Sequence, residues 1–154
     1  MPFKLVLTTA LLLTLISCEK VELSQINQNW SLEAIEIDGK ASFECSQMLR
    51  EKEVSLVIEP EEDHFRFGGQ SFVNAYFGSF SILKYNRSSG KLNVKGVGST
   101  KKLGPPALQA CEDYYFKMLD AADSFALSAN GELHLLGQKE IDGKPSKIEL
   151  IFHK

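Results

Sequence analysis

The sequence predicts an α+β domain: an antiparallel sheet of about eight short strands, curled into a partial β-barrel, with one helix packed across it. Short segments that alternate apolar and polar residues recur along the chain, with turn residues between them. One segment changes to helical spacing, between the sixth and seventh strands. The length of 154 residues, with 44% hydrophobic and 24% charged residues, fits one globular domain.

The first strands are predicted at residues 30–37, 54–58 and 64–68, and residues 41–52 are left as a connection, with or without one helical turn. The central segment, 72–100, predicts a β-hairpin that turns at 86–90. If its first strand is regular, alternate residues share one face. These are Phe72, Asn74, Tyr76 and Gly78. Gly78 interrupts the strand where a sheet would bend or bulge.

Helical spacing begins after Gly104, Pro105 and Pro106, which suit a helix start. The apolar stripe predicts a helix over residues 107–122 that covers one face of the sheet. Its members are Leu108, Cys111, Tyr115, Met118, Leu119 and Ala122. The charged residues of this helix are expected to point elsewhere. They are Glu112, Asp113, Lys117 and Asp120. Strands at 124–128, 132–136 and 147–152 follow, and Asn130-Gly131 forms a hairpin turn.

The N-terminus predicts export. Lys4 precedes an apolar run of about a dozen residues, which is shorter than the roughly 20 that a membrane-spanning helix needs. The residues from Leu15 to Cys18 resemble the bacterial lipobox, whose cysteine is lipidated and becomes the first residue after cleavage. The alternative is an ordinary cleaved signal with a chance cysteine. Several acyl chains on Cys18 would anchor the protein without inserting it into the membrane.

These patterns divide the chain into a lipoprotein signal peptide (1–17), a polar tether (18–28) and a folded domain (29–154). The expected location is the bacterial cell envelope, with the outer membrane favoured over the inner. The chain has 17 basic and 20 acidic residues and no basic patch dense enough for nucleic-acid binding. The expected partners are the membrane and an envelope protein or cell-wall component, and the oligomeric state is left open.

Two cysteines, Cys45 and Cys111, belong to the expected domain. In an oxidising compartment they can form a disulfide that closes a loop of about 66 residues. The alternative is two separate buried thiols, because free cysteine is among the most buried residue types.

Several segments together resemble the META domain, the HslJ-like family. They are Asn29-Trp30, Asn74–Phe80, Lys91–Val94, Ser99–Lys102, Glu112 with Tyr115 and Leu119, and Leu133–Leu136. The resemblance covers roughly residues 29–154. It implies a small, mostly antiparallel domain that is common in bacterial envelope proteins, is associated with stress and antibiotic tolerance, and has no established enzymatic activity. The family-motif residues, with structural or binding roles, are Trp30, Asn74, Tyr76, Gly78 and Thr100.

Two departures from the family concern cysteine. The family often has a cysteine directly before the asparagine, where this chain has Val73, and another soon after the threonine, where this chain has Lys102, Leu103 and Gly104. A disulfide of the family type is therefore absent, and a bond between Cys45 and Cys111 would be a different link.

No sequence pattern points to catalysis, a metal or a cofactor. His64, His134 and His153 are far apart in the sequence and are interpreted as solvent-facing, and the acidic run 61–63 as a solvated turn. A structural role is favoured for the Thr100 hydroxyl, as a brace of the loop between hairpin and helix. Asn74 and Tyr76 receive the same interpretation, as buried groups that hydrogen-bond to loops.

The sequence thus favours a non-enzymatic envelope lipoprotein, a binding or stress-tolerance module at the membrane surface. The alternative is a carrier of a small apolar ligand within the curled sheet, lined by aromatic side chains. These are Phe65, Phe67, Phe72, Tyr76, Phe77 and Phe80. A cavity of roughly several hundred cubic ångströms would favour the carrier. A hydrolase would require His64 or His134 to lie beside a serine and an acid.

Overall fold

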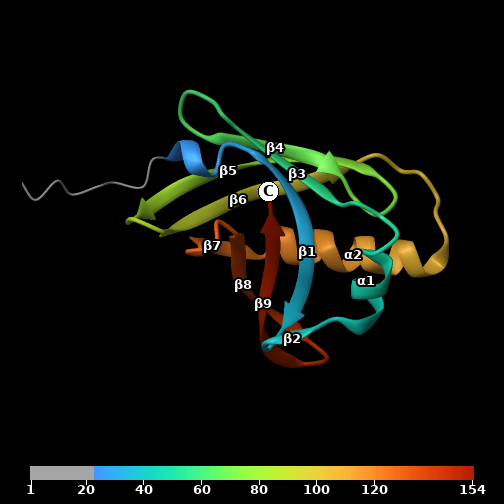
Figure 1. The fold of residues 1–154 in the computed structure, drawn as a ribbon. Coiled ribbons are helices and arrows are strands. Elements are labelled where there is room, and N and C mark those ends of the chain that lie inside the picture. Colours follow the sequence, from blue (N-terminus) through green and yellow to red (C-terminus); the bar gives the residue numbers. More distant parts are fainter. Residues whose placement is uncertain (1–22) are drawn as a thin grey trace, which may run out of the picture.

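A computed structural model describes residues 23–154, which form a closed antiparallel β-barrel with one long helix against its side (Figure 1). The predicted signal peptide and Cys18 lie outside the described residues. The strands are β1 (Asn29–Ile37), β2 (Lys40–Ala41), β3 (Ser55–Pro60), β4 (Phe65–Gln70), β5 (Ala75–Tyr85), β6 (Ser89–Ser99), β7 (Ala122–Leu127), β8 (Leu133–Ile141) and β9 (Lys144–His153). The helical elements are η1 (Leu23–Gln25), α1 (Phe43–Met48) and α2 (Pro106–Asp120).

The barrel closes because the last strand pairs with the first. Strands β1 and β3 to β9 each pair antiparallel with their neighbours, and β9 returns to β1, while β2 is a short extra strand on β1. The result is an eight-stranded barrel, in which closure removes the exposed sheet edge that an open sheet would present. The predicted antiparallel α+β fold with a curled sheet and one helix across it is confirmed.

Strand β9 illustrates how the sequence pattern sets the inside of the barrel. Ile148, Leu150 and Phe152 alternate along the strand, and all three are fully buried. The turn before this strand is Asp142-Gly143, where both residues have positive φ. Two consecutive residues in this region favour a tight hairpin whose twist matches that of the strands. The turn therefore fixes the register that places the three apolar side chains in the core.

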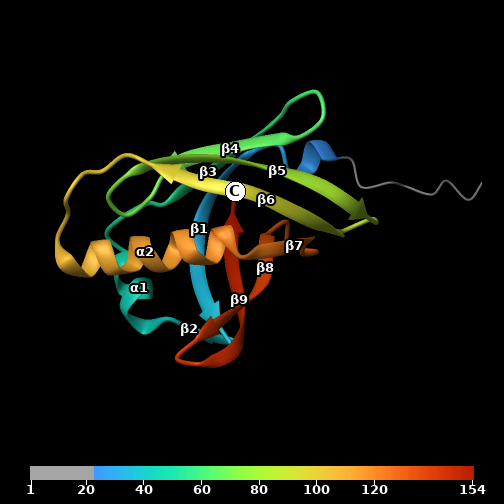
Figure 2. The ribbon, with the colours of Figure 1, turned by 180° about the vertical axis from the view of Figure 1, so that it is seen from behind.

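Helix α2 fills the place where two neighbouring strands diverge. Strands β6 and β7 pair through three residue pairs, at Ser89 to Lys91, and then separate. Helix α2 connects these two strands and crosses this side of the barrel (Figure 2). Its predicted apolar stripe supplies Cys111, Tyr115, Met118 and Leu119 to the core. The helix starts one residue earlier than predicted, at Pro106, and ends at Asp120.

Two segments differ from the sequence-based expectation. Strand β5 begins at Ala75, so Phe72 and Asn74 lie in the turn between β4 and β5 instead of in a regular strand. The Ser71 N–H closes this turn by donating to the Asn74 carbonyl at 2.8 Å. Residues 41–52, left as a connection, contain helix α1, whose six residues are too few to show a period in the sequence.

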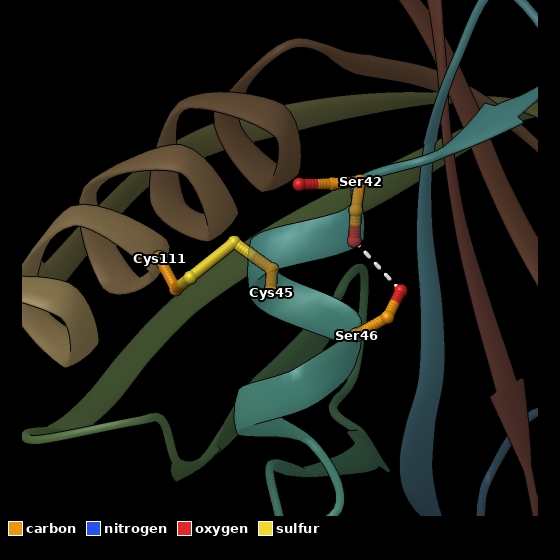
Figure 3. Close-up of a disulfide and its surroundings, with 4 residues drawn as sticks. All are labelled: Ser42, Cys45, Ser46 and Cys111. Carbon is orange, nitrogen blue, oxygen red and sulfur yellow. Dashed lines mark hydrogen bonds between the residues drawn. A yellow bond between two sulfur atoms is a disulfide. The ribbon is translucent and has the colours of Figure 1, made fainter.

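A disulfide joins the two helices. Cys45 on α1 and Cys111 on α2 are bonded, with their Cα atoms 5.5 Å apart (Figure 3). Both are buried. In α1 the Ser46 hydroxyl donates to the Ser42 carbonyl at 2.7 Å, an interaction within the first turn of the helix. The bond fastens the connection between β2 and β3 to the long helix.

The chain before β1 also packs against the barrel. Of the expected tether, residues 23–28 are described, and Ile26 is 2% exposed. The indole N–H of Trp30 donates to the Ile26 carbonyl at 3.0 Å. Trp30 itself is 1% exposed, so this hydrogen bond holds the approach to β1 in the core.

The disulfide is expected to contribute much of the stability of the domain. Replacing both Cys45 and Cys111 by alanine should lower the free energy of unfolding by roughly 4 kcal/mol, because the unfolded chain is no longer constrained by the closed loop. Urea unfolding measures the change. A thiol reductant should lower the stability of the wild type similarly and leave that of the double variant unchanged. Equal stabilities of wild type and variant would contradict this prediction.

Candidate functional site

Buried polar side chains gather where the turn between β4 and β5, the loop after β6, and α2 meet. Ser71, Asn74 and Glu112 are each at most 3% exposed, and they are three of the four buried polar or charged residues in the described part of the chain. We call this group, with its hydrogen-bond partners, the Glu112 cluster. Its members are Ser71, Val73, Asn74, Thr100, Lys102, Gln109 and Glu112.

The Glu112 carboxylate accepts five hydrogen bonds. Oε2 accepts from the Ser71 hydroxyl, from the backbone N–H of Val73 at 2.9 Å and from that of Asn74 at 2.7 Å. Oε1 accepts from Asn74 Nδ2 at 2.6 Å and from Gln109 Nε2 at 3.2 Å. A carboxylate offers about four lone-pair sites, so both oxygens are fully engaged.

Asn74, which binds Glu112, also binds the loop after β6. Its Oδ1 accepts from the Thr100 hydroxyl at 2.8 Å and from the Lys102 backbone N–H at 2.7 Å. The Thr100 N–H also donates to the Ala75 carbonyl at 3.0 Å. Asn74 therefore bridges α2, through Glu112, to the loop that leads into α2.

The hydrogen bonds keep Glu112 ionised although it is buried. Desolvation is the largest single effect and raises the pKa of Glu112, because it penalises the charged form. The hydrogen bonds from Ser71, Asn74 and Val73 act in the opposite direction and together outweigh it, so the pKa is lowered. A carboxylate with a lowered pKa and engaged oxygens is a poor general base at neutral pH.

A second polar contact lies one helical turn further along α2. The Tyr76 hydroxyl donates to the Ser55 carbonyl at 2.7 Å, and it lies 2.6 Å from the Tyr115 hydroxyl. Because Tyr76 has one proton, Tyr115 is the donor in the second bond. Burial raises the pKa of both phenols well above the ordinary value, so both stay neutral.

The expectation that Glu112 points away from the sheet is wrong. Residue 112 follows Leu108 by four positions and precedes Tyr115 by three, which places it on the buried stripe of α2. A charge is tolerated there because the 71–74 turn supplies donors. The sequence therefore carried one indication of this buried site: an acidic residue at a position within the apolar stripe of the helix.

Comparisons with known proteins agree with this fold. A family model described as META domain matches residues 21–145. The chain belongs to the META domain family. Among solved structures, a protein from Burkholderia xenovorans studied by NMR is similar over 98% of this chain and 96% of its own, with a TM-score of 0.51 and 17% identity. This similarity shows the fold. No curated protein matches the chain significantly.

The META motif residues lie in three places in the structure. Asn74 and Thr100 meet in the Glu112 cluster, and Tyr76 contacts the next turn of α2 through Tyr115. Gly78 lies elsewhere, on β5, where a Cβ would come within 2.3 Å of the Phe67 ring, and the pairing of β5 with β6 shifts register just after it. Trp30 is at the start of β1. The motif is thus not one continuous site.

The resemblance implies cysteines at position 73 and within residues 102–104, and these two segments are in contact in this chain. Val73 and Gly104 lie so close that a Cβ added to Gly104 would be 2.5 Å from Val73 Cγ2. The two segments are therefore held against each other here by an apolar contact. The disulfide of this chain, Cys45–Cys111, joins other segments, α1 and α2.

In the described part of the chain, none of the three histidines hydrogen-bonds to the Glu112 cluster, and each lies near a carboxylate of its own: His153 is 3.8 Å from Glu33. His64 lies 3.1 Å from Glu61 and 2.7 Å from Asp63, and His134 Nδ1 lies 2.6 Å from Glu149. Within residues 23–154, no three His, Cys, Asp or Glu side chains are placed to hold a metal ion. None of the helices in this range has the length and hydropathy to cross a membrane.

Replacing Glu112 by glutamine should destabilise the domain at pH 7 by roughly 2–4 kcal/mol, because an amide cannot accept all of the buried hydrogen bonds. The pKa of Glu112 is lower in the folded than in the unfolded state, so its contribution is present above the ordinary Glu pKa of about 4.3 and is lost as the pH falls through the folded pKa. The stability difference between wild type and E112Q should therefore narrow in acid.

Urea unfolding between pH 7 and pH 3 measures this difference. Asp113→Asn is the matched control, because Asp113 is exposed on the same helix and its loss should leave stability nearly unchanged. A constant difference between wild type and E112Q across this range would contradict the assignment of a lowered pKa to Glu112.

The two tyrosines should respond unequally to loss of the hydroxyl. Tyr76→Phe leaves the buried Tyr115 hydroxyl without an acceptor and should cost roughly 2 kcal/mol. Tyr115→Phe leaves Tyr76 bonded to Ser55 and should cost roughly 1 kcal/mol. Equilibrium unfolding of both variants tests the order, and a larger loss for Tyr115→Phe would reverse the donor assignment.

Proposed function

We propose that this META domain protein is a bacterial envelope lipoprotein, attached through Cys18 and acting without enzymatic activity as a binding or stress-tolerance module at the membrane surface. The observation that carries the proposal is the short apolar leader that ends in Leu15-Ile16-Ser17-Cys18. The lipid-bearing cysteine would lie a few residues before the domain. Attachment by acyl chains would leave the whole barrel outside the bilayer.

The disulfide supports an exported location. Cys45 and Cys111 are bonded, and disulfides persist in oxidising compartments such as the bacterial periplasm and the cell surface. The third cysteine of the chain, Cys18, would be consumed by lipidation. This division of the three cysteines is consistent with a mature protein that carries no free thiol.

The Glu112 cluster supports a structural role for the META motif. The Glu112 carboxylate has a lowered pKa and accepts five hydrogen bonds. The Asn74 side chain donates to Glu112 through its nitrogen and accepts from Lys102 through its oxygen. An acid–base catalyst requires a group free to exchange a proton with a substrate, and a nucleophile requires an adjacent base. The polar atoms of this cluster already hold loops together, so we infer that activity lies in binding at the surface.

The alternative, a carrier within the barrel, lacks support from the interior. The cavity between the sheet and α2 has a volume of about 20 Å³. It is lined by the apolar side chains of Leu56, Ile58, Phe67, Phe80, Leu92, Leu119, Ala122 and Leu135. Ligand sites of small molecules typically have volumes of roughly 300–1,000 Å³. The aromatic residues expected to line a ligand site fill the core instead or, like Phe77, face solvent.

Lipidation can be tested directly on the full chain expressed in a bacterium. The wild type should appear in the membrane fraction, and mass spectrometry of its N-terminal peptide should show Cys18 with attached acyl chains. Cys18→Ala should lose both properties. Ser17→Ala is the matched control, because it keeps a small residue before the cysteine and should remain lipidated. An unmodified Cys18 in the wild type would refute the anchor.

The binding role is tested by cross-linking cells that carry the anchored wild type or Cys18→Ala, followed by capture and mass spectrometry. An envelope protein or cell-wall component enriched with the anchored form would support a surface module. A small apolar ligand retained by both forms would instead favour the carrier.

A further inference from the structure

The tip of the β5–β6 hairpin projects beyond the barrel. The last residue of β5 that pairs with β4 is Phe80, opposite Phe65, whereas β5 and β6 continue to pair as far as Tyr85 and Gly90. Figures 1 and 2 both show this end of the hairpin extending past the neighbouring strands. At the base of this end, Ser89 to Lys91 of β6 pair with β7, whereas residues 83–87 pair with neither β4 nor β7.

Large apolar side chains are exposed on this projection. Leu83 is 67% exposed and Tyr85 is 40% exposed, and they are two of the five large hydrophobic residues exposed in the described part of the chain. The turn that presents them is ordered by Asn86, whose Oδ1 accepts from the backbone N–H groups of Ser88 and Ser89. Exposing these apolar side chains to water is unfavourable, and burying them against a partner would lower the free energy.

Two basic residues belong to the same tip: Lys84 lies between Leu83 and Tyr85 in the chain, and Arg87 follows Tyr85 by two residues. Both are exposed, and within residues 23–154 no carboxylate lies within ion-pair distance of either. By contrast, Lys91 further along the hairpin is 3.3 Å from Asp123, and Arg66 is 2.8 Å from Glu59. An exposed leucine and tyrosine beside unpaired cations is the composition that favours the boundary between water and lipid headgroups.

The pairing register puts this tip at the same end of the barrel as the start of the described chain. Ser31, near the beginning of β1, pairs with His153, and the adjacent Phe152 pairs with Leu133. Leu133 pairs with Leu127, whose N–H donates to the carbonyl of Ser88 in the hairpin turn. Both views show η1 and the hairpin tip on one side of the molecule.

Covalent geometry limits how far this end can be from an anchor at Cys18. Cys18 precedes Leu23 by five residues, and five residues span at most about 18 Å even when fully extended. An anchored domain would thus be held with its η1 end near the bilayer surface, and the hairpin tip belongs to that end.

We propose that the hairpin tip, residues 83–87, is a second membrane contact, in which Leu83 and Tyr85 enter the phospholipid headgroup layer and Lys84 and Arg87 bind headgroup phosphates. This inference rests on the proposed anchor at Cys18. A second contact fixes the orientation of the barrel relative to the membrane, which a single point of attachment does not determine.

Tryptophan fluorescence of the full-length lipidated protein in vesicles of phosphatidylethanolamine and phosphatidylglycerol tests the contact. Leu83→Trp places a reporter on the tip, and Leu103→Trp is the matched control, because Leu103 is 100% exposed on the loop before α2, at the opposite end of the barrel. The native Trp30 is buried, and the wild type gives its constant background.

The tip reporter should shift its emission to shorter wavelength in vesicles and lose intensity when the lipids carry a nitroxide quencher near the headgroup. The Leu103→Trp reporter should do neither. Replacing Lys84 and Arg87 by glutamate in the Leu83→Trp protein should reduce the quenching, since the phosphates would then repel the tip.

Flotation of the same vesicles separates the two ways in which the proposal can fail. If the protein floats with the vesicles but Leu83→Trp is quenched no more than Leu103→Trp, the hairpin contact is refuted and the anchor stands. If the full-length protein purified from bacterial membranes does not float with the vesicles, the anchor itself is refuted. The orientation derived from the anchor is then refuted as well.

Discussion

The hydrogen bonds of the buried Glu112 carboxylate position the segments that strand pairing leaves free: the 71–74 turn, the loop after β6 and helix α2. The barrel is closed by backbone pairing, but that pairing does not fix the 71–74 turn or the loop after β6. Glu112 holds the turn directly and the loop through Asn74. Burying a charge is costly unless hydrogen bonds compensate for the lost water. The position of α2 is therefore coupled to the turn, because displacing either would leave a buried charge or buried donors unpaired.

Two neighbouring residues attach α2 to the rest of the domain by different means. Cys111 bonds covalently to Cys45 on α1, and Glu112 binds the turn between β4 and β5. The first link depends on the redox compartment and the second on pH, since the pKa of Glu112 is lowered in the folded state. At neutral pH a reduced chain would thus keep its electrostatic attachment. Val73, which packs on Gly104, belongs to the turn that Glu112 binds, so this attachment and an apolar contact secure one segment.

Local patterns predicted the barrel strands and helix α2, but they did not predict β2, the start of β5 or the contacts between segments distant in sequence. The alternation of Ile148, Leu150 and Phe152 and the stripe of α2 identify buried faces from periodicity alone. Pairing of β1 with β9 joins segments more than 100 residues apart, and no local pattern encodes it. The orientation of Glu112 depends on donors about 40 residues earlier. Helical spacing puts residue 112 on the buried stripe, the polarity of glutamate favours the exposed side, and the tertiary hydrogen bonds stabilise the buried position.

The META motif residues Asn74 and Thr100 and the proposed membrane contact lie at opposite ends of the barrel. The Glu112 cluster and the loop that carries Leu103 lie at the end away from η1, while the hairpin tip with Leu83 lies at the η1 end. In a domain anchored through Cys18, the tip would face the lipid and the loop 100–105 would face away from it. The hydrogen bond between Thr100 and Asn74 fixes the start of that loop. Leu103, further along the loop, is 100% exposed and so is not buried against the described part of the domain. The motif would then act indirectly: it would hold a loop in a defined conformation at the face most accessible to an envelope partner, and hydrogen bonds that stabilise the fold would also preorganise a binding surface.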